Sequence, residues 1–144
     1  MADDDDDDRM LAQKALRGSR LANEMRFVAD GEQLMRYLRQ EPPFAMGADA
    51  PRPGIILLDL NMPKMDGREA LSAIKADPEL RHIPVVVLTT SGAEEDIVRT
   101  YDLGVNSFVS KPVTFEELAA VMRTLACYWF DLVELPQEPR DGDA

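Results

Sequence analysis

Apolar and polar residues follow two alternating patterns along the chain, and these patterns predict strands and helices in turn. Short apolar runs bounded by turn residues indicate strands buried on both faces, as in a parallel sheet. By this criterion we predict strands at Ile55–Asp59 and Pro84–Leu88. We predict two further strands at Met25–Ala29 and Val105–Ser110. Apolar residues at helical spacing predict helices over Arg9–Leu21, Glu32–Leu38, Arg68–Ala76, Glu94–Leu103 and Phe115 to about Val133.

This alternation predicts an α/β fold with a right-handed, doubly wound parallel sheet. A chain of 144 residues is most simply one domain. We place that domain at residues 1–135, including the C-terminal helix, and expect Pro136–Ala144 to be a polar, disordered tail. The segment Glu41–Pro53 is rich in Pro, Gly and Ala and is predicted as a long surface loop.

The charge balance narrows the class of partner. The chain carries 27 acidic and 16 basic residues, a net charge of −11. Nucleic-acid binding needs a basic face, so this composition argues against it and favours contact with cations or basic protein surfaces. No apolar run is long enough to cross a bilayer and we identify no signal peptide, so we expect no membrane association.

Single residues exclude several kinds of enzyme site. The only cysteine, Cys127, has apolar neighbours and is expected to pack rather than react; it suits a reducing cytoplasm. The only histidine, His82, lies in a polar connection and is expected at the surface. A Ser-His-Asp triad or a multi-histidine metal site is therefore disfavoured.

Chemistry-bearing residues stand where the predicted strands end. Asp59 and Lys111 close two of the strands, Thr89 follows a third, and the aspartate run Asp3–Asp8 belongs to the same edge. Asp59 taken alone is equally well explained as a carboxylate that caps a strand. Together, these residues predict two anionic positions, a hydroxyl and a cation at one edge of the sheet.

Such an edge can support phosphoryl chemistry. Clustered carboxylates repel one another and need a compensating cation, and oxygen ligands favour Mg²⁺ that keeps several waters. An aspartate beside Mg²⁺ can act as a nucleophile toward phosphorus. Lys111 as a point charge and the Thr89 hydroxyl would then stabilise the phosphoryl oxygens.

The motifs in this chain resemble the receiver domain of bacterial two-component response regulators. The resemblance runs from Asp3 to about Thr124. It rests on Asp3-Asp4, Asp59, Asn61-Met62-Pro63, Asp66-Gly67, Thr89, Phe108 and Lys111-Pro112, in that order. It implies a flavodoxin-like (βα)5 fold with strand order 2-1-3-4-5.

The resemblance also implies roles for individual residues. Asp59 would accept a phosphoryl group from a histidine kinase, and Lys111 would pair with the acyl phosphate. Thr89 and Phe108 would move together as the switch. Mg²⁺ would be held by Asp4, Asp59 and the backbone carbonyl of Asn61, with Asp3 binding through water. The protein would thus transfer a phosphoryl group to itself rather than turn over an external substrate.

The register of the aspartate run is set by Arg9, which identifies Asp3 and Asp4 as the acidic pair and leaves Asp5 as the alternative. For Asp5–Asp8 we favour a solvated loop and helix cap. A receiver should begin with an apolar strand, but only Met1-Ala2 precede Asp3, so we expect a truncated first strand. A mis-assigned or truncated start, a strand supplied by a partner, and a weakened sheet with compromised metal binding all remain open explanations.

Among receivers, the chain resembles the stand-alone kind associated with bacterial phytochrome histidine kinases. The long loop after the second helix, the Leu88–Ser91 run and an aromatic C-terminal extension carry this resemblance. Output would then pass through protein contacts or phosphate relay. For the extension we favour a homodimer contact over packing on the chain's own core, and the candidate interface residues are Tyr128, Trp129, Phe130 and Leu132.

Three other functions compete with a phosphorylated receiver. A phosphatase of the haloacid-dehalogenase type needs a second aspartate two residues after the first, where this chain has Asn61. A nucleotide-binding enzyme would need a Gly-rich phosphate loop, and neither common type is present. A degenerate receiver that acts only as a dimeric scaffold stays open because of the short first strand.

Overall fold

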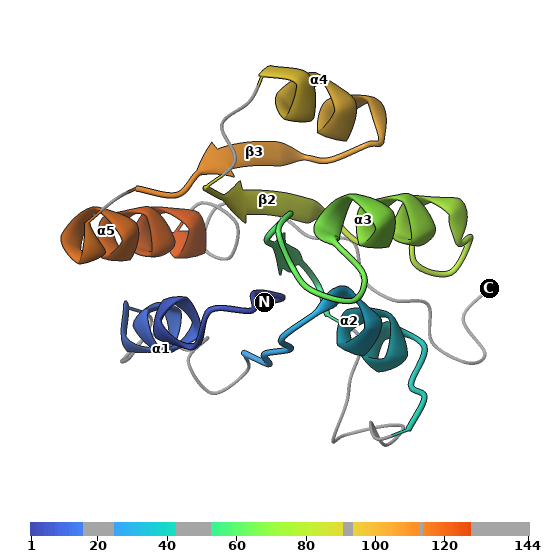
Figure 1. Ribbon diagram of the computed structural model, residues 1–144, viewed down its shortest axis with the longest axis horizontal. Helices are drawn as coiled ribbons and strands as arrows, with labels where there is room; N and C mark the ends of the chain where they lie inside the picture. Colours follow the sequence, from blue (N-terminus) through green and yellow to red (C-terminus); the bar gives the residue numbers. More distant parts are fainter. Residues whose placement is uncertain (16–24, 43–52, 91–93, 113, 128–144) are drawn as a thin grey trace.

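The computed structural model describes residues 1–15, 25–42, 53–90, 94–112 and 114–127. The helices are α1 (Asp6–Ala15), α2 (Gly31–Leu38), α3 (Gly67–Ala76), α4 (Glu94–Asp102) and α5 (Phe115–Ala126). The strands are β1 (Ile56–Leu58), β2 (Val85–Thr89) and β3 (Ser107–Ser110) (Figure 1). The predicted alternation of strand and helix is confirmed. The candidate dimer residues Tyr128, Trp129, Phe130 and Leu132 lie outside the described residues.

The sheet is parallel, and its strand order is β1-β2-β3. Two isolated bridges extend it, because Ala2 pairs in parallel with Leu58 on one side and with Val28 on the other. Five segments of the chain therefore lie in the order Val28, Ala2, β1, β2, β3. Numbered along the sequence this is 2-1-3-4-5, which confirms the flavodoxin-like topology.

The first segment joins the sheet through backbone hydrogen bonds of Met1, Ala2 and Asp3. The N–H of Ala2 donates to the carbonyl of Leu57 over 2.8 Å, and the carbonyl of Ala2 accepts from the N–H of Asp59 over 2.9 Å. On the other side, the N–H of Asp3 donates to the carbonyl of Val28 over 3.1 Å. The prediction of a strand over all of Met25–Ala29 is wrong in extent, since extended backbone forms a strand only where a neighbour supplies ladder hydrogen bonds.

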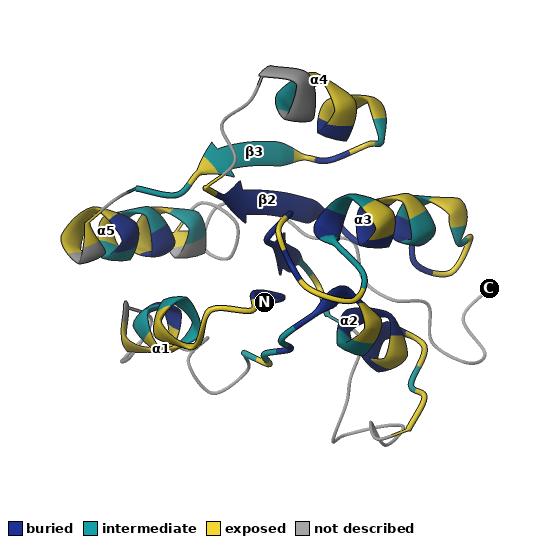
Figure 2. Ribbon diagram, viewed as in Figure 1, coloured by how far each residue is buried: buried dark blue, intermediate teal, exposed yellow. Residues whose placement is uncertain are grey.

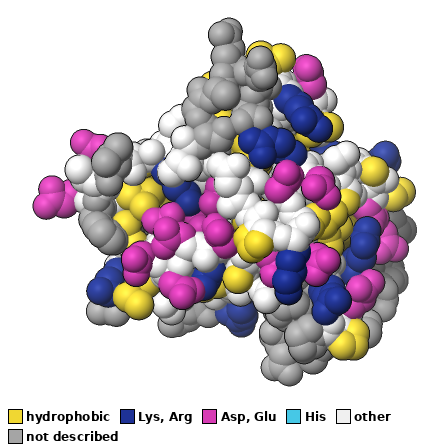
Figure 3. Space-filling view, in the orientation of Figure 1, with side chains coloured by type: hydrophobic (Ala, Val, Ile, Leu, Met, Phe, Trp, Pro, Cys, Tyr) yellow, Lys and Arg dark blue, Asp and Glu magenta, His cyan; other side chains and the backbone are white. Residues whose placement is uncertain are grey.

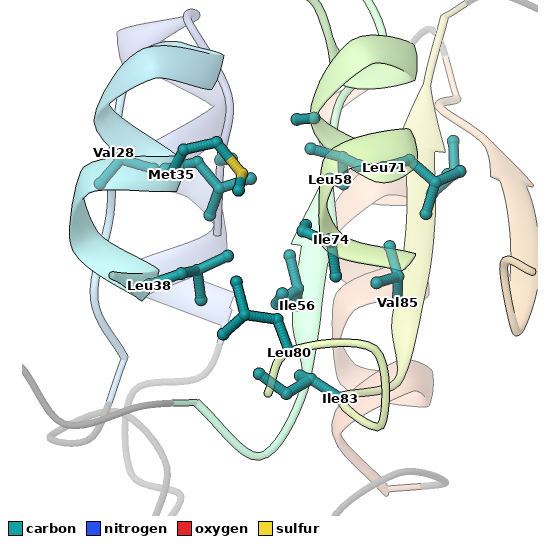
Figure 4. Close-up of a cluster of buried hydrophobic side chains, with 14 of the residues drawn as sticks. Val28, Met35, Leu38, Ile56, Leu58, Leu71, Ile74, Leu80, Ile83 and Val85 are labelled. Atoms are coloured by element: carbon teal, nitrogen blue, oxygen red, sulfur yellow. The ribbon is translucent and has the colours of Figure 1, made fainter. Parts of the chain in front are cut away.

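Side chains along the strands alternate between two buried clusters, as the period of a strand requires. Ile56, Leu58, Val85 and Val87 pack with α2 and α3, and Figure 4 shows this cluster. Leu57, Val86 and Leu88 point to the opposite face, where they pack with Ala12 of α1 and with Leu118 and Met122 of α5. Every residue of β2 is buried (Figure 2). Central strands covered on both faces hold the residues at their ends in fixed positions.

Local capping sets where the helices begin. The Oδ1 atom of Asp5 accepts from the N–H of Asp7 over 2.8 Å and of Asp8 over 3.2 Å, so α1 begins at Asp6 rather than at Arg9. Asp30 caps α2, Asp66 caps α3 and Thr114 caps α5 in the same way. Within the described ranges, every helix is too short or too polar to cross a bilayer.

Candidate phosphoacceptor site

Adjacent strands bring the predicted site residues to one edge of the sheet. Asp59 follows β1, Thr89 ends β2 and Lys111 follows β3. The N–H of Lys111 donates to the carbonyl of Thr89 over 2.7 Å, and Asp3 follows the bridge residue Ala2, whose carbonyl accepts from Asp59. The sequence prediction that these strand ends meet is therefore confirmed.

The ammonium of Lys111 is surrounded by three carboxylates. Its Nζ lies 2.6 Å from Oδ2 of Asp3, 2.8 Å from Oδ2 of Asp8 and 3.3 Å from Oδ2 of Asp59. The Lys111 side chain is 4% exposed, and the Asp3 side chain is 0% exposed. A buried ion pair of this kind is sensitive to the loss of one partner, because the remaining charge would be left without compensation.

The electrostatics of this cluster are dominated by an excess of negative charge. Burial by itself would lower the pKa of Lys111, but the hydrogen bonds with Asp3 and Asp8 and the charge of Asp59 outweigh it and raise that pKa. Burial raises the pKa of Asp3, although Lys111 acts in the opposite direction. The two shifts have different causes, because carboxylate partners raise the pKa of Lys111 whereas burial raises the pKa of Asp3.

The acidic groups are close enough to share a cation. One carboxylate oxygen from each of Asp3, Asp4 and Asp59 lies within 4.8 Å of the others. Asp3 and Asp59 are buried, whereas Asp4 is exposed. Figure 3 shows acidic side chains gathered on the face around α1. A donor set made only of oxygens, with more negative charge than Lys111 balances, fits a hard divalent cation such as Mg²⁺.

Asn61 links Asp59 to the hydroxyl at the end of β2. Its backbone N–H donates to Oδ1 of Asp59 over 3.2 Å, while its side-chain amide lies 3.4 Å from Oγ1 of Thr89. Thr89 is fully buried. Oδ1 of Asp59 therefore accepts a backbone hydrogen bond, and Oδ2 of the same carboxylate faces Lys111.

Two glycines hold the loop after Asp59 against its surroundings. A Cβ atom on Gly67 would lie 2.2 Å from the carbonyl oxygen of Asp59, and one on Gly31 would lie 2.1 Å from that of Met65. The N–H of Gly67 donates to the carbonyl of Leu60 over 2.9 Å, and the N–H of Gly31 donates to the carbonyl of Met65 over 3.0 Å. Backbone approaches this close admit only glycine. The motif Asp66-Gly67 therefore fixes the loop geometry as well as capping α3.

Phe108, the predicted switch aromatic, is partly buried in β3 and packs against the cluster on the α2 and α3 side. It pairs with Val87, whereas Thr89 pairs with Ser110 two residues further along β3. Its backbone N–H donates to the hydroxyl of Tyr101 in α4 over 3.3 Å. The phenyl ring and the Thr89 hydroxyl thus belong to adjacent strands.

The expectation of a solvated loop and cap for Asp5–Asp8 is correct for Asp5 but wrong for Asp8. Asp5 caps α1, as described above, but the Asp8 carboxylate contacts the buried Lys111. Helical periodicity could have identified Asp8, because it stands four residues before Ala12, which is buried against the sheet. The sequence also did not predict the hydrogen bonds of Arg9, whose guanidinium donates to the Asp3 carbonyl and to the Asp6 carboxylate.

Comparisons with known proteins agree with this geometry. The model of the response regulator receiver domain family matches residues 1–123. The response regulator Rcp1 of Synechocystis sp. is 39% identical over 136 residues, which are 94% of this chain and 90% of that protein. The chain therefore belongs to the receiver domain family of response regulators, as its motifs predicted.

Among solved structures, the chain is similar to phytochrome response regulators. The phosphorylated cyanobacterial phytochrome response regulator RcpA superposes with a TM-score of 0.88 at 44% identity, and the match covers 94% of this chain and 95% of that one. The Mn²⁺-bound form of response regulator Rcp1 gives a TM-score of 0.84 at 37% identity, covering 94% and 96%. The resemblance to the phytochrome-associated kind of receiver is confirmed, and the phosphatase and nucleotide-binding alternatives are set aside.

Proposed function

We propose that the protein is a stand-alone response regulator of a two-component phosphorelay and that Asp59 accepts a phosphoryl group from a histidine kinase. The observation that carries this proposal is the buried ammonium of Lys111 beside Oδ2 of Asp59, in a chain of the receiver family. Solved relatives named as phytochrome and bacteriophytochrome response regulators support a bacterial phytochrome as the kinase. We place the protein in the cytoplasm together with that kinase. The scaffold alternative has no comparable support.

In the proposed reaction, a carboxylate oxygen of Asp59 attacks the phosphorus of a phosphohistidine. An O–P bond forms, the P–N bond breaks, and the imidazole nitrogen keeps the electron pair. Lys111 holds a positive charge where negative charge accumulates on the phosphoryl oxygens, and the Thr89 hydroxyl is available as a donor. Thr89 and Phe108 then act as the switch that reports phosphorylation.

We further propose that Asp3, Asp4, Asp59 and the backbone carbonyl of Asn61 hold Mg²⁺. The proximity of the three carboxylates supports this set, as does the Mn²⁺-bound form of the relative Rcp1. When bound, the ion neutralises charge on the phosphoryl oxygens. In this set Asp3, which is buried, would bind through water, and Asp4 is the exposed member.

Output is proposed to pass through a homodimer formed by Tyr128, Trp129, Phe130 and Leu132. The concentration of aromatic residues after α5 supports this contact. Light scattering at tens of micromolar tests it. We expect twice the chain mass for the wild type and a monomer for Trp129→Ala, whereas a wild-type monomer would exclude the dimer.

Transfer from a phosphorylated histidine kinase tests the proposed function. The kinase, labelled on its histidine, is mixed with the protein and Mg²⁺, and the label on each is followed. We expect label to move to the wild type and to Asp102→Asn, an exposed control on α4, but not to Asp59→Asn. Equal labelling of Asp59→Asn and the wild type would refute Asp59 as the acceptor.

A further inference from the structure

Lys111 has a carboxylate partner that the proposed phosphoryl chemistry does not use. Its Nζ lies 2.8 Å from Oδ2 of Asp8, in the first turn of α1, whereas Asp3 and Asp59 follow segments of the sheet. An ammonium has three N–H donors. In the unphosphorylated protein, the three carboxylates are sufficient to engage all of them.

A phosphoryl group on Asp59 would bring new acceptors to an ammonium whose donors are already engaged. Of the three carboxylates that contact Lys111, Asp59 would carry the phosphoryl group, and Asp3 is one of the proposed Mg²⁺ ligands. Asp8 has neither role. The Asp8 side chain is also 22% exposed against 0% for Asp3, so it can turn toward water at the lowest cost of desolvated charge.

We propose that Asp8 competes with the phosphoryl group for Lys111. Asp8 holds the ammonium in the unphosphorylated protein and yields it when Asp59 is phosphorylated, so that it slows phosphorylation. This role rests on the proposed function and adds a regulatory residue from α1 to the same site. The negative charge of Asp8 acts in the same direction, because it repels an anionic phosphodonor.

The exchange of partners would also couple α1 to the state of Asp59. Asp8 stands one helical turn before Ala12, which packs in one cluster with Leu118 and Met122 of α5. Release of Asp8 removes the ionic contact between the first turn of α1 and the site. The packing of α1 on α5 then remains as the link through which the change reaches the C-terminal helix.

Matched variants in the same helical turn test the competition. Asp8→Asn and Asp7→Asn remove the same charge from the first turn of α1, but Asp7 is exposed and is not among the partners of Lys111. The initial rate of Asp59 phosphorylation by a small acyl phosphate with Mg²⁺ is measured by intact mass. We expect Asp8→Asn to react about three-fold faster than Asp7→Asn, the effect of one partly exposed ion pair.

Asp8→Glu keeps the charge and should retain the wild-type rate. An Asp8→Asn rate equal to or below that of Asp7→Asn would overturn the competition while leaving Asp59 as the acceptor. No adduct on the wild type would instead refute the proposed function, and with it this role of Asp8.

A second measurement needs no phosphorylation. The labelling of Lys111 by an amine-reactive reagent in unphosphorylated protein is quantified by peptide mass. Loss of Asp8 removes one of the three carboxylate partners that hold the ammonium, so Asp8→Asn should label faster at Lys111 than Asp7→Asn. Equal labelling would show that Asp8 does not hold Lys111, whatever the outcome at Asp59.

Discussion

Gly31 donates its backbone N–H to the carbonyl oxygen of Met65 over 3.0 Å, and this contact joins the start of α2 to the loop after Asp59. A Cβ atom on Gly31 would lie 2.1 Å from that oxygen. Gly31→Ala should therefore displace the loop and lower the free energy of unfolding by about 2 kcal/mol, as overpacking does. Urea unfolding checks this value. Glu32→Ala, one residue later on an exposed position, is the control, and equal losses for both variants would contradict the account.

Replacement of Lys111 should destabilise the protein when no divalent cation is present. Lys111→Met leaves Asp3 and Asp59 buried without their ammonium, and we expect a loss of about 3 kcal/mol in urea unfolding. Lys64→Met is the matched control, because the Lys64 side chain is 62% exposed and its Nζ lies 3.9 Å from Asp30. Its expected loss is below about 0.5 kcal/mol. If Lys111→Met were as stable as Lys64→Met, the buried ion pair would not hold the site together.

The Asp4 carboxylate should destabilise the fold when no divalent cation is bound, and it should stabilise the fold when Mg²⁺ is bound. In Asp4→Asn, repulsion with Asp3 and Asp59 falls, and the thermal midpoint without divalent cation should rise by about 1–2 °C. The same variant should bind Mg²⁺ about ten-fold more weakly in calorimetric titration. Asp7→Asn provides the charge-matched control for both measurements. Unchanged Mg²⁺ affinity in Asp4→Asn would remove Asp4 from the ligand set.

Lys75, which lies outside the candidate site, should make the free energy of unfolding depend on pH. Burial lowers its pKa from 10.5, and its Nζ donates to the carbonyls of Arg81 over 3.2 Å and Ile83 over 3.3 Å. Between the lowered pKa and 10.5, the unfolded chain binds a proton that the folded chain has lost, so the free energy of unfolding rises with pH in this window.

The variant Lys75→Met isolates this contribution. Its free energy of unfolding minus that of the wild type should be more positive at pH 7, where the wild type bears the cost of the buried charge, than near pH 10.5. Urea unfolding at the two pH values measures the difference. A difference that does not change with pH would show that Lys75 is not held in a desolvated position.

The sequence predicts the site residues at strand ends well. Asp59 and Thr89 each follow a strongly apolar run, and Lys111 follows a more polar strand, Val105–Ser110. Within Asp3–Asp8, identical residues carry no internal register, so the assignment of roles depended on alignment with Arg9 and missed the contact of Asp8 with Lys111. The structure separates them through the position of the helix start: Asp3 lies next to the bridge residue Ala2, Asp5 is a cap, and Asp8 reaches Lys111.

The extent of pairing at Met25–Ala29 also could not be predicted from the sequence. Its apolar residues suit a strand, but whether a strand forms depends on hydrogen bonds from another segment. In the structure Val28 forms a bridge with Ala2, and Arg26 accepts a hydrogen bond from the terminal ammonium of Met1. Periodicity describes which face of a segment is apolar, whereas pairing is a property of two segments brought together.

Intact-mass measurement after incubation with a small acyl phosphate is the decisive test of Asp59 as the phosphoacceptor. With Mg²⁺, the wild type should gain the mass of one phosphoryl group, and the gain should disappear in Asp59→Asn and on removal of the cation by a chelator. An adduct of the same yield on Asp59→Asn, or no adduct on the folded wild type with any phosphodonor, would contradict the assignment of Asp59 as the phosphoacceptor.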